Sequence, residues 1–320
     1  MSIVRRKILL TGKNGQVGWE LERSLQPLGQ VIAFDHTGMD LANPDSIRSV
    51  IREVKPDLIV NPAAYTAVDK AESEPDLAMA VNGVAPGIMA EEAKRLGAAL
   101  IHYSTDYVFD GTKAEPYMEE DVPNPINVYG KTKLAGERAI QAVGVPHMIF
   151  RTSWVYGIRG KNFLLTIRRM AKEKNELRIV DDQFGAPTWS RMIAETTAQI
   201  LAQYYSSISY RSTFPRTDFN DIYHVTAGGR ATWYEFAKAI LEDVLSGVLS
   251  RLTEEERFAQ WPHGLPNLTP ITTEEYQLPA KRPFNSVLSN HKLNSHFGLA
   301  LPNWSTSLTL CADELYKGFV

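Results

Sequence analysis

Tyr129 and Lys133 stand four positions apart in a segment, 126–143, whose apolar spacing is helical. Residues four apart lie on one face of a helix. A free tyrosine has a pKa of about 10, which makes it a poor acid or base at neutral pH. A nearby ammonium stabilises the phenolate and lowers that pKa, and Lys133 is the group placed to do so. Alone, such a pair is more often a solvated helix face, so its context decides.

Two hydroxyls precede this pair, at Ser104 and Thr105, where the apolar run 98–101 continues into polar residues. We interpret this stretch as the end of a buried strand. Thr105, or Ser104 in its place, could donate a hydrogen bond to a substrate carbonyl oxygen. With Tyr129 as proton donor, such a site could polarise and protonate a carbonyl while a cofactor delivers hydride.

A glycine-rich turn near the start of the chain indicates what that cofactor is. Gly12, Gly15 and Gly18 follow the apolar run 7–11 and precede an amphipathic segment that includes Leu21 and Leu25. One glycine permits a tight turn, one lets the backbone approach a pyrophosphate, and one lets helix and strand pack closely. Strand, turn and helix together predict a dinucleotide site, with NADPH or NADH as the cofactor.

Acidic residues after the second strand extend this site. Asp35 ends the strand 31–35, where a carboxylate can hydrogen-bond an adenosine ribose, which favours NADH. Lys13 in the turn could instead meet a 2′-phosphate, so both cofactors stay open. Asp40 and Leu41 are plausible adenine contacts, or simply the approach to the next helix.

Strands and helices alternate along the first half of the chain, which predicts an α/β fold with a doubly wound parallel sheet. The fold class is a Rossmann sheet with a second, smaller α/β substrate-binding lobe. We place the dinucleotide domain at 1–155, with a return at about 188–227, and the substrate domain at 156–187 and 228–320. We expect strands at 7–11, 31–35, 56–61, 98–104, 147–151, 177–180 and 222–226, helices at 44–54, 74–96, 126–143, 162–174, 192–204 and 233–245, and a surface loop at 205–220.

Composition excludes several classes of protein. The 320 residues carry a formal net charge of −3 and the pI is near 6.2, which argues against a nucleic-acid-binding surface. No apolar run approaches the length of a membrane span, and the short run after Lys7 is no signal peptide. The single cysteine, Cys311, fits a reducing compartment, so we expect a cytoplasmic protein.

Several longer motifs resemble the extended short-chain dehydrogenase/reductases and, more narrowly, the dTDP-4-dehydrorhamnose reductases. These motifs span nearly the whole chain. They are 11–18 (TGKNGQVG), 61–72 (NPAAYTAVDKAE), 104–111 (STDYVFDG), 129–133 (YGKTK), 151–157 (RTSWVYG), 182–188 (DQFGAPT) and 282–286 (RPFNS).

The resemblance implies NAD(P)H-dependent reduction of the C4 keto group of dTDP-4-dehydro-L-rhamnose to dTDP-L-rhamnose, as part of dTDP-rhamnose biosynthesis. It implies Thr105, Tyr129 and Lys133 as the catalytic triad, and a deoxysugar nucleotide held by Val68, Tyr107, Trp154 and Arg282. The implied cofactor-binding residues are Gly12, Gly15, Gln16, Val17, Asp40, Leu41, Ala63, Ala64, Tyr65 and Lys133. The reasoning from the residues adds Gly18 in the turn and Asp35 at the end of the second strand.

Two of these assignments have physical support. The forked guanidinium of Arg282 suits a diphosphate, and Trp154 offers a flat wall to a sugar ring, with plain core packing as the alternative. Some relatives form homodimers with a divalent metal at the interface. Mg²⁺ therefore stays open for a homodimer, although no carboxylate cluster in this chain demands a metal.

Other functions share parts of this pattern. A sugar-nucleotide dehydratase or epimerase has the same fold and the Tyr–Lys pair, but a dehydratase carries two acids after the threonine. Here Asp106 is followed by Tyr107, which favours simple carbonyl reduction. The chain also resembles the non-catalytic regulatory subunit of methionine adenosyltransferase. The sugar-facing Val68, Trp154 and Arg282 favour the enzyme.

Overall fold

A central parallel sheet of six strands organises the computed structural model, which describes residues 6–210, 219–245, 247, 253–255 and 264–317. The strand order is β10-β5-β4-β3-β1-β2, with every pair parallel. The prediction of a doubly wound α/β sheet is confirmed. The strands are β1 (Lys7–Leu10), β2 (Gln30–Ala33), β3 (Leu58–Asn61), β4 (Ala99–Thr105), β5 (His147–Thr152) and β10 (Asn220–His224).

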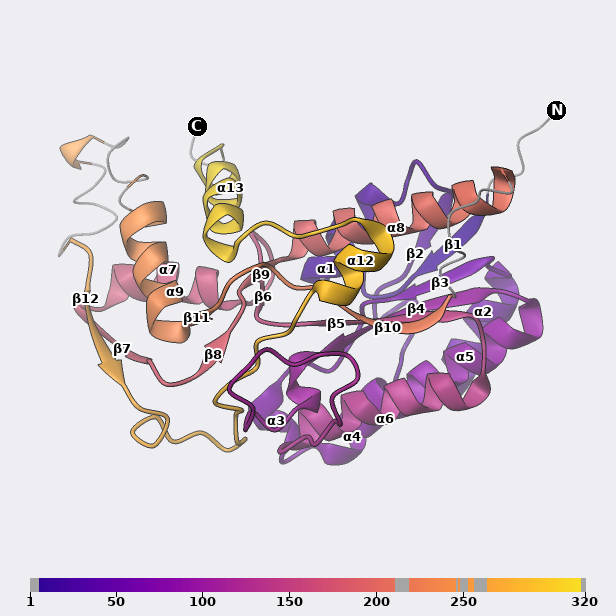
Figure 1. The fold of residues 1–320 in the computed structure, drawn as a ribbon, viewed down its shortest axis with the longest axis horizontal. Coiled ribbons are helices and arrows are strands. Elements are labelled where there is room, and N and C mark those ends of the chain that lie inside the picture. The colour runs from indigo at the N-terminus through magenta and orange to yellow at the C-terminus, as the bar shows by residue number, and fades with distance from the viewer. Residues whose placement is uncertain (1–5, 211–218, 246, 248–252, 256–263, 318–320) are drawn as a thin grey trace.

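Helices cover both faces of this sheet (Figure 1). Each face has its own apolar core, and the strands are buried between the two because their side chains alternate from one face to the other. One face carries α1 (Gln16–Ser24), α8 (Ser190–Tyr210) and α12 (His291–Phe297), and the other carries α2 (Pro44–Val54), α5 (Ala85–Leu96) and α6 (Val128–Val143).

The predicted helix at 74–96 is interrupted. The segment consists of α4 (Pro75–Met79), the π-helical turn η1 (Ala80–Val84) and α5. Proline lacks a backbone N–H and crowds the preceding turn, so Pro86 disfavours an unbroken α-helical ladder here. Within η1, the side-chain amide of Asn82 accepts from the Tyr65 N–H and donates to the Tyr65 carbonyl oxygen.

A second apolar core lies beside the sheet (Figure 1). It is built on three short strand pairs, β6 with β9, β7 with β12 and β8 with β11. The strands are β6 (Val155–Tyr156), β7 (Glu176–Val180), β8 (Phe184–Gly185), β9 (Thr188–Trp189), β11 (Ala231–Thr232) and β12 (Asn267–Ile271). Its helical elements are α7 (Phe163–Glu173), α9 (Trp233–Ala239), the π-helical η3 (Ile240–Leu245) and α13 (Trp304–Lys317).

The end of one expected helix differs from the structure. Helix α8 continues to Tyr210, so the first part of the expected loop at 205–220 is helical, whereas residues 211–218 lie outside the described part of the chain.

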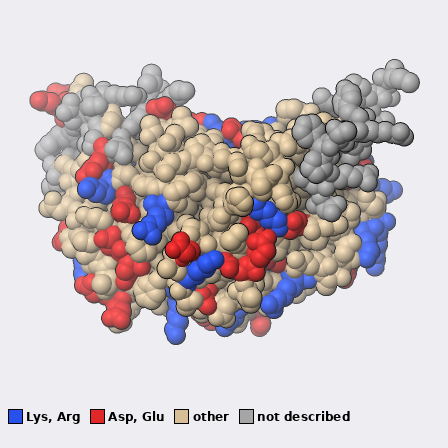
Figure 2. All heavy atoms as spheres, viewed as in Figure 1, with Lys and Arg blue, Asp and Glu red and all other residues tan. Residues whose placement is uncertain are grey.

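Figure 2 shows acidic and basic side chains interspersed on the face in view, in keeping with the small net charge. Within the described residues, no helix is long and apolar enough to cross a membrane.

Candidate active site

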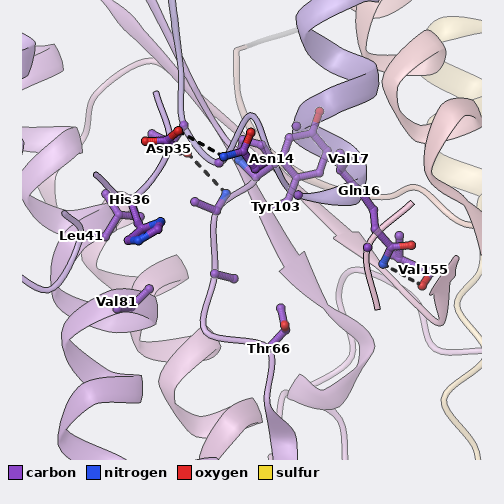
Figure 3. Close-up of a pocket in the computed structure, with 18 of the residues that line it drawn as sticks. Asn14, Gln16, Val17, Asp35, His36, Leu41, Thr66, Val81, Tyr103 and Val155 are labelled. Carbon is purple, nitrogen blue, oxygen red and sulfur yellow. Dashed lines mark hydrogen bonds between the residues drawn. The ribbon is translucent and has the colours of Figure 1, made fainter. Parts of the chain in front are cut away.

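A cavity of about 570 Å³ opens at the carboxyl ends of the central strands (Figure 3). Ligands of open parallel sheets bind at this edge, outside the strand ends. Most of the sequence-predicted cofactor residues line this cavity: Gly12, Gly15, Gln16, Val17, Gly18, Asp35, Asp40, Leu41, Ala63 and Ala64. The catalytic candidates Tyr129 and Lys133 line it as well, so the structure brings the two predicted groups together.

The glycine turn has the close packing that a dinucleotide site needs. Gly12 has a φ of +61°, and a Cβ on Gly18 would lie 2.1 Å from the carbonyl oxygen of Gly12. Gly15 is the N-cap residue of α1, and no side chain of the described residues caps that helix end. Its first N–H groups are therefore left for an anion, and they fit the pyrophosphate of a dinucleotide.

Asp35 lies at the cavity edge after β2 and is held as a carboxylate. Its Oδ1 accepts from the hydroxyl of Thr37 at 2.6 Å and from the Gly38 N–H at 3.2 Å. These hydrogen bonds lower the pKa of Asp35 to about 2. Its Oδ2 accepts from Asn14 at 3.1 Å and lies 3.8 Å from the ammonium of Lys13. An acid and a cation thus stand together where the adenosine end is expected.

For Asp40 and Leu41, contact with the adenine stays a prediction. Both line the cavity. The Asp40 carboxylate also accepts from the Ala42 N–H at 2.9 Å, just before the Asn43 side chain caps α2. Ala63 and Ala64 line the cavity, whereas Tyr65 is not among the lining residues. The Tyr65 hydroxyl donates to the Glu74 carboxylate.

Tyr129 is half-buried near the start of α6, where Asn127 caps the helix by accepting from the Gly130 N–H. Burial raises the pKa of Tyr129 to about 12; a hydrogen bond with Thr105 opposes the rise and the nearby Asp106 adds to it. The expectation that Lys133 lowers this pKa is therefore wrong for the described structure. The phenol stays protonated at neutral pH, which is the form that can donate a proton.

Lys133 lies one turn further along α6, and only 1% of its surface is exposed. Its ammonium donates to the carbonyl oxygen of Tyr103 at 2.6 Å and lies 3.3 Å from Nε2 of His102. Burial lowers the pKa of Lys133 to about 8, against the opposing effect of the Glu137 carboxylate. The same burial holds the pKa of His102 well below its usual value, with Lys133 adding to the effect, so His102 is neutral.

Ser104, which lines the cavity, and Thr105 differ in the partners of their hydroxyls. Ser104 donates to Glu137, a residue already held by Arg151 in a bidentate ion pair with distances of 3.0 and 2.7 Å. Thr105 ends β4 and hydrogen-bonds Tyr129. The hydroxyl beside the proton donor is therefore that of Thr105.

Three substrate candidates gather next to Tyr129. The Tyr107 ring, in the 3-10 turn η2 (Asp106–Val108), meets that of Tyr129 edge to face, with centroids 5.8 Å apart. Burial raises the pKa of Tyr107, and the charges of Arg282 and Asp69 both act on it. Arg282 is held by Asp69 at 2.8 and 3.1 Å. Val68, next to Asp69, begins the short helix α3 (Val68–Ala71).

Trp154 is fixed by packing. Its indole stacks on Trp233 with centroids 3.5 Å apart, and on its other side a Cβ at Gly185 would come within 2.2 Å of the ring. Its φ is +46°, which is rare for a residue other than glycine. Trp154 is only partly buried despite this stacking, so its contact with a sugar ring stays a prediction.

A polar chain that the sequence reasoning missed crosses the sheet beneath the cavity. The hydroxyl of Thr11 donates to Asn61 at 2.6 Å, and Asn61 contacts Nδ1 of His102 at 3.1 Å. His102 in turn meets Lys133. All four residues are buried. The signal in the sequence was the presence of asparagine and histidine inside otherwise apolar strands.

A second omission is the segment at 157–162 beside the turn. Asn162 donates to the side-chain oxygen of Gln16 at 2.8 Å, and Gly160 and Lys161 join the cavity lining.

No group of three or more His, Cys, Asp or Glu residues within the described ranges is arranged to hold a metal ion. Mg²⁺ at a dimer interface stays a prediction.

Comparisons with known proteins agree on one family. Residues 6–317 match the family described as the RmlD substrate binding domain. The dTDP-4-dehydrorhamnose reductases of Burkholderia thailandensis and Escherichia coli K12 are 46% and 44% identical, and each match covers 97% of this chain and 99% or 98% of the relative. The crystal structure of the Bacillus anthracis dTDP-4-dehydrorhamnose reductase in complex with NADP is similar with a TM-score of 0.80, at 33% identity, covering 97% of this chain and 99% of that one.

Proposed function

The chain belongs to the dTDP-4-dehydrorhamnose reductase family, and we propose that it reduces the C4 keto group of dTDP-4-dehydro-L-rhamnose to give dTDP-L-rhamnose. The observation that carries this proposal is the protonated phenol of Tyr129, one helical turn from Lys133 in a cavity that begins at an uncapped glycine turn. Carbonyl reduction needs a proton donor beside a hydride donor.

A bound nicotinamide dinucleotide supplies the hydride, which forms the new C4–H bond. Tyr129 supplies the proton to the carbonyl oxygen, so that the C=O bond becomes C–OH and the phenol becomes a phenolate. Thr105 hydrogen-bonds Tyr129 in the free site, and with substrate bound it donates its one hydroxyl proton to the same carbonyl oxygen instead. Lys133, held by the carbonyl oxygen of Tyr103, reaches the ribose next to the nicotinamide.

We assign the remaining predicted residues by their place. The first N–H groups of α1 bind the pyrophosphate, with Gly15 leaving room for it. Asp35 can accept from a ribose hydroxyl of NADH and Lys13 can meet the 2′-phosphate of NADPH, so the cofactor is NADPH or NADH. The NADP complex of the Bacillus anthracis relative supports the second of these.

For the substrate, we assign the deoxysugar nucleotide to the side of Tyr129 where Val68, Tyr107 and Arg282 gather. Arg282 already binds one bidentate acid, Asp69, and a diphosphate has matching geometry. Trp154 contributes the part of its ring that stays exposed beside its stack on Trp233. The division into a dinucleotide domain at 1–155 and 188–227 and a substrate domain at 156–187 and 228–320 follows this assignment.

The test is turnover of a panel of 4-keto-sugar nucleotides by the purified protein, with NADPH and NADH in separate assays. We expect loss of the reduced cofactor's absorbance with dTDP-4-dehydro-L-rhamnose, and a product heavier by two hydrogens. Binding of the dinucleotide without turnover of any keto sugar would contradict the proposal and favour a non-catalytic regulatory role.

A further inference from the structure

Asp106 is an acid that the mechanism above does not use, although it lies next to the reacting groups. It follows Thr105 directly, and only 2% of its surface is exposed. Its Oδ1 lies 2.9 Å from Oγ1 of Thr105. Its Oδ2 is buried and has no partner at hydrogen-bonding distance among the described residues; the Ser286 hydroxyl acts on this carboxyl group but donates to the Phe184 carbonyl oxygen at 3.2 Å. Such a group is costly to keep in a folded protein, so it calls for an explanation.

The hydrogen bond between these two residues can run in either direction. A threonine hydroxyl has a single proton to donate. A carboxylate only accepts, so an ionised Asp106 holds the Thr105 proton on its own Oδ1. A carboxylic acid can donate instead, and Thr105 then keeps its proton for another acceptor. Oγ1 of Thr105 also accepts from the Tyr107 N–H at 3.2 Å, and the hydroxyl interacts with Tyr129 at the reacting end of the site.

We propose that Asp106 is a positioning residue that sets the direction of the Thr105 hydrogen bond. As a carboxylic acid it donates to Oγ1 of Thr105 and turns the Thr105 proton toward the substrate carbonyl and Tyr129. As a carboxylate it withdraws that proton from the site. The inference rests on the proposed reductase function and adds a protonation requirement to it.

The surroundings of Asp106 favour its protonated form. Burial raises the pKa of Asp106 to about 7, and the hydroxyls of Ser286 and Thr105 oppose the rise. The titratable groups that feel its charge are Tyr107 on its own turn and Tyr129 on α6, both neutral because their pKa values are raised. The charged pair of Asp69 and Arg282, from α3 and the C-terminal segment, acts on Tyr107.

The pH dependence follows from this direction. Below about pH 7 Asp106 is protonated and Thr105 is free to donate; above it, the carboxylate removes that donor. We expect kcat/KM for the keto-sugar nucleotide to fall by about tenfold per pH unit on the alkaline side. Asp106→Asn removes the titration, because an amide keeps one hydrogen-bonding pattern at every pH, so the fall around pH 7 should disappear.

Lys133 needs a separate control because its pKa, at about 8, lies close by. Ser286→Ala serves as that control and as a second variant if Asp106→Asn fails to fold. The Ser286 hydroxyl lowers the pKa of Asp106, so its removal should shift the alkaline fall to higher pH. An alkaline fall that stays in place in both variants would overturn the inference and assign the titration to Lys133.

The two proposals fail differently. A wild-type protein that turns over no keto-sugar nucleotide at any pH would overturn the proposed function, and this inference with it. A wild-type protein that is active, beside an Asp106→Asn variant with the same alkaline fall, would overturn the inference alone. Dinucleotide binding by each variant, measured by fluorescence titration, shows that the site is still folded.

Discussion

The side-chain ammonium of Lys133 donates to the backbone carbonyl oxygen of Tyr103 across 2.6 Å. This bond joins α6 to β4 at the depth of the cavity, with His102 as a second neighbour of the ammonium. The sheet therefore fixes the position of Lys133, whose side chain also lines the cavity. Its position depends on main chain that no side-chain substitution removes.

Replacing Lys133 with methionine should impair both turnover and cofactor affinity. The positive charge that lines the cavity is lost together with a ribose hydrogen bond, so kcat should fall by about a hundredfold or more. The Kd for the dinucleotide, measured by fluorescence titration, should rise. Lys131→Met is the matched control, because Lys131 is exposed on the same helix. An unchanged Kd in the Lys133 variant would remove the ribose contact from the mechanism.

Replacing Tyr129 with phenylalanine should lower kcat by about a hundred- to ten-thousandfold, because the proton donor is lost while the ring remains. Dinucleotide binding should stay close to wild type. Tyr276→Phe is the control, since Tyr276 is 49% exposed. Steady-state turnover and a binding titration check the two halves of the prediction. Near-normal turnover of the Tyr129 variant would contradict its assignment as the acid.

Replacing Asp35 with alanine should change the choice of cofactor. The ribose acceptor and the negative charge facing a 2′-phosphate disappear together, so KM should rise by about tenfold for NADH and fall or stay level for NADPH. The measurement is KM for each dinucleotide at a fixed concentration of keto sugar. Asp45→Ala serves as a control, because its side chain is 97% exposed. Equal changes for both cofactors would place the ribose elsewhere.

Replacing Arg151 with methionine should destabilise the fold. Glu137 would be left buried without its bidentate partner, which costs about 3 to 5 kcal/mol in the free energy of unfolding. Urea unfolding followed by circular dichroism measures the change. Breaking the exposed pair of Arg169 with Glu173 by Arg169→Met should cost about 0.5 kcal/mol or less. Similar losses in both variants would mean that the buried pair has no special weight.

Much of the fold could be predicted because its signals are local. The buried strands are short apolar runs closed by glycine, proline or polar residues, and the glycines at Gly12, Gly15 and Gly18 lie between such a strand and a helix. The pairing of Tyr129 with Lys133 also follows from helical spacing alone. These features need no knowledge of what packs against them.

The features that were missed depend on distant partners. The pKa of Tyr129 rises because the phenol is shielded from water, and the ammonium of Lys133, which was expected to lower it, is bound by the carbonyl oxygen of Tyr103. Strand β12 lies in a stretch dense in proline and threonine, and its pairing with β7 across the chain makes it a strand. The full length of α8 likewise exceeds what its own apolar spacing indicated.

The order of the strands has a consequence for how the chain is made. β10 forms an edge of the central sheet beside β5, and α8 packs on α1, with Ser24 bonded to Ala194 at a separation of 170 residues. During synthesis, therefore, the nucleotide-binding half stays incomplete until more than two thirds of the chain has left the ribosome. Such long-range closure is slow and leaves apolar surface exposed, so chaperone dependence should be strongest late in translation.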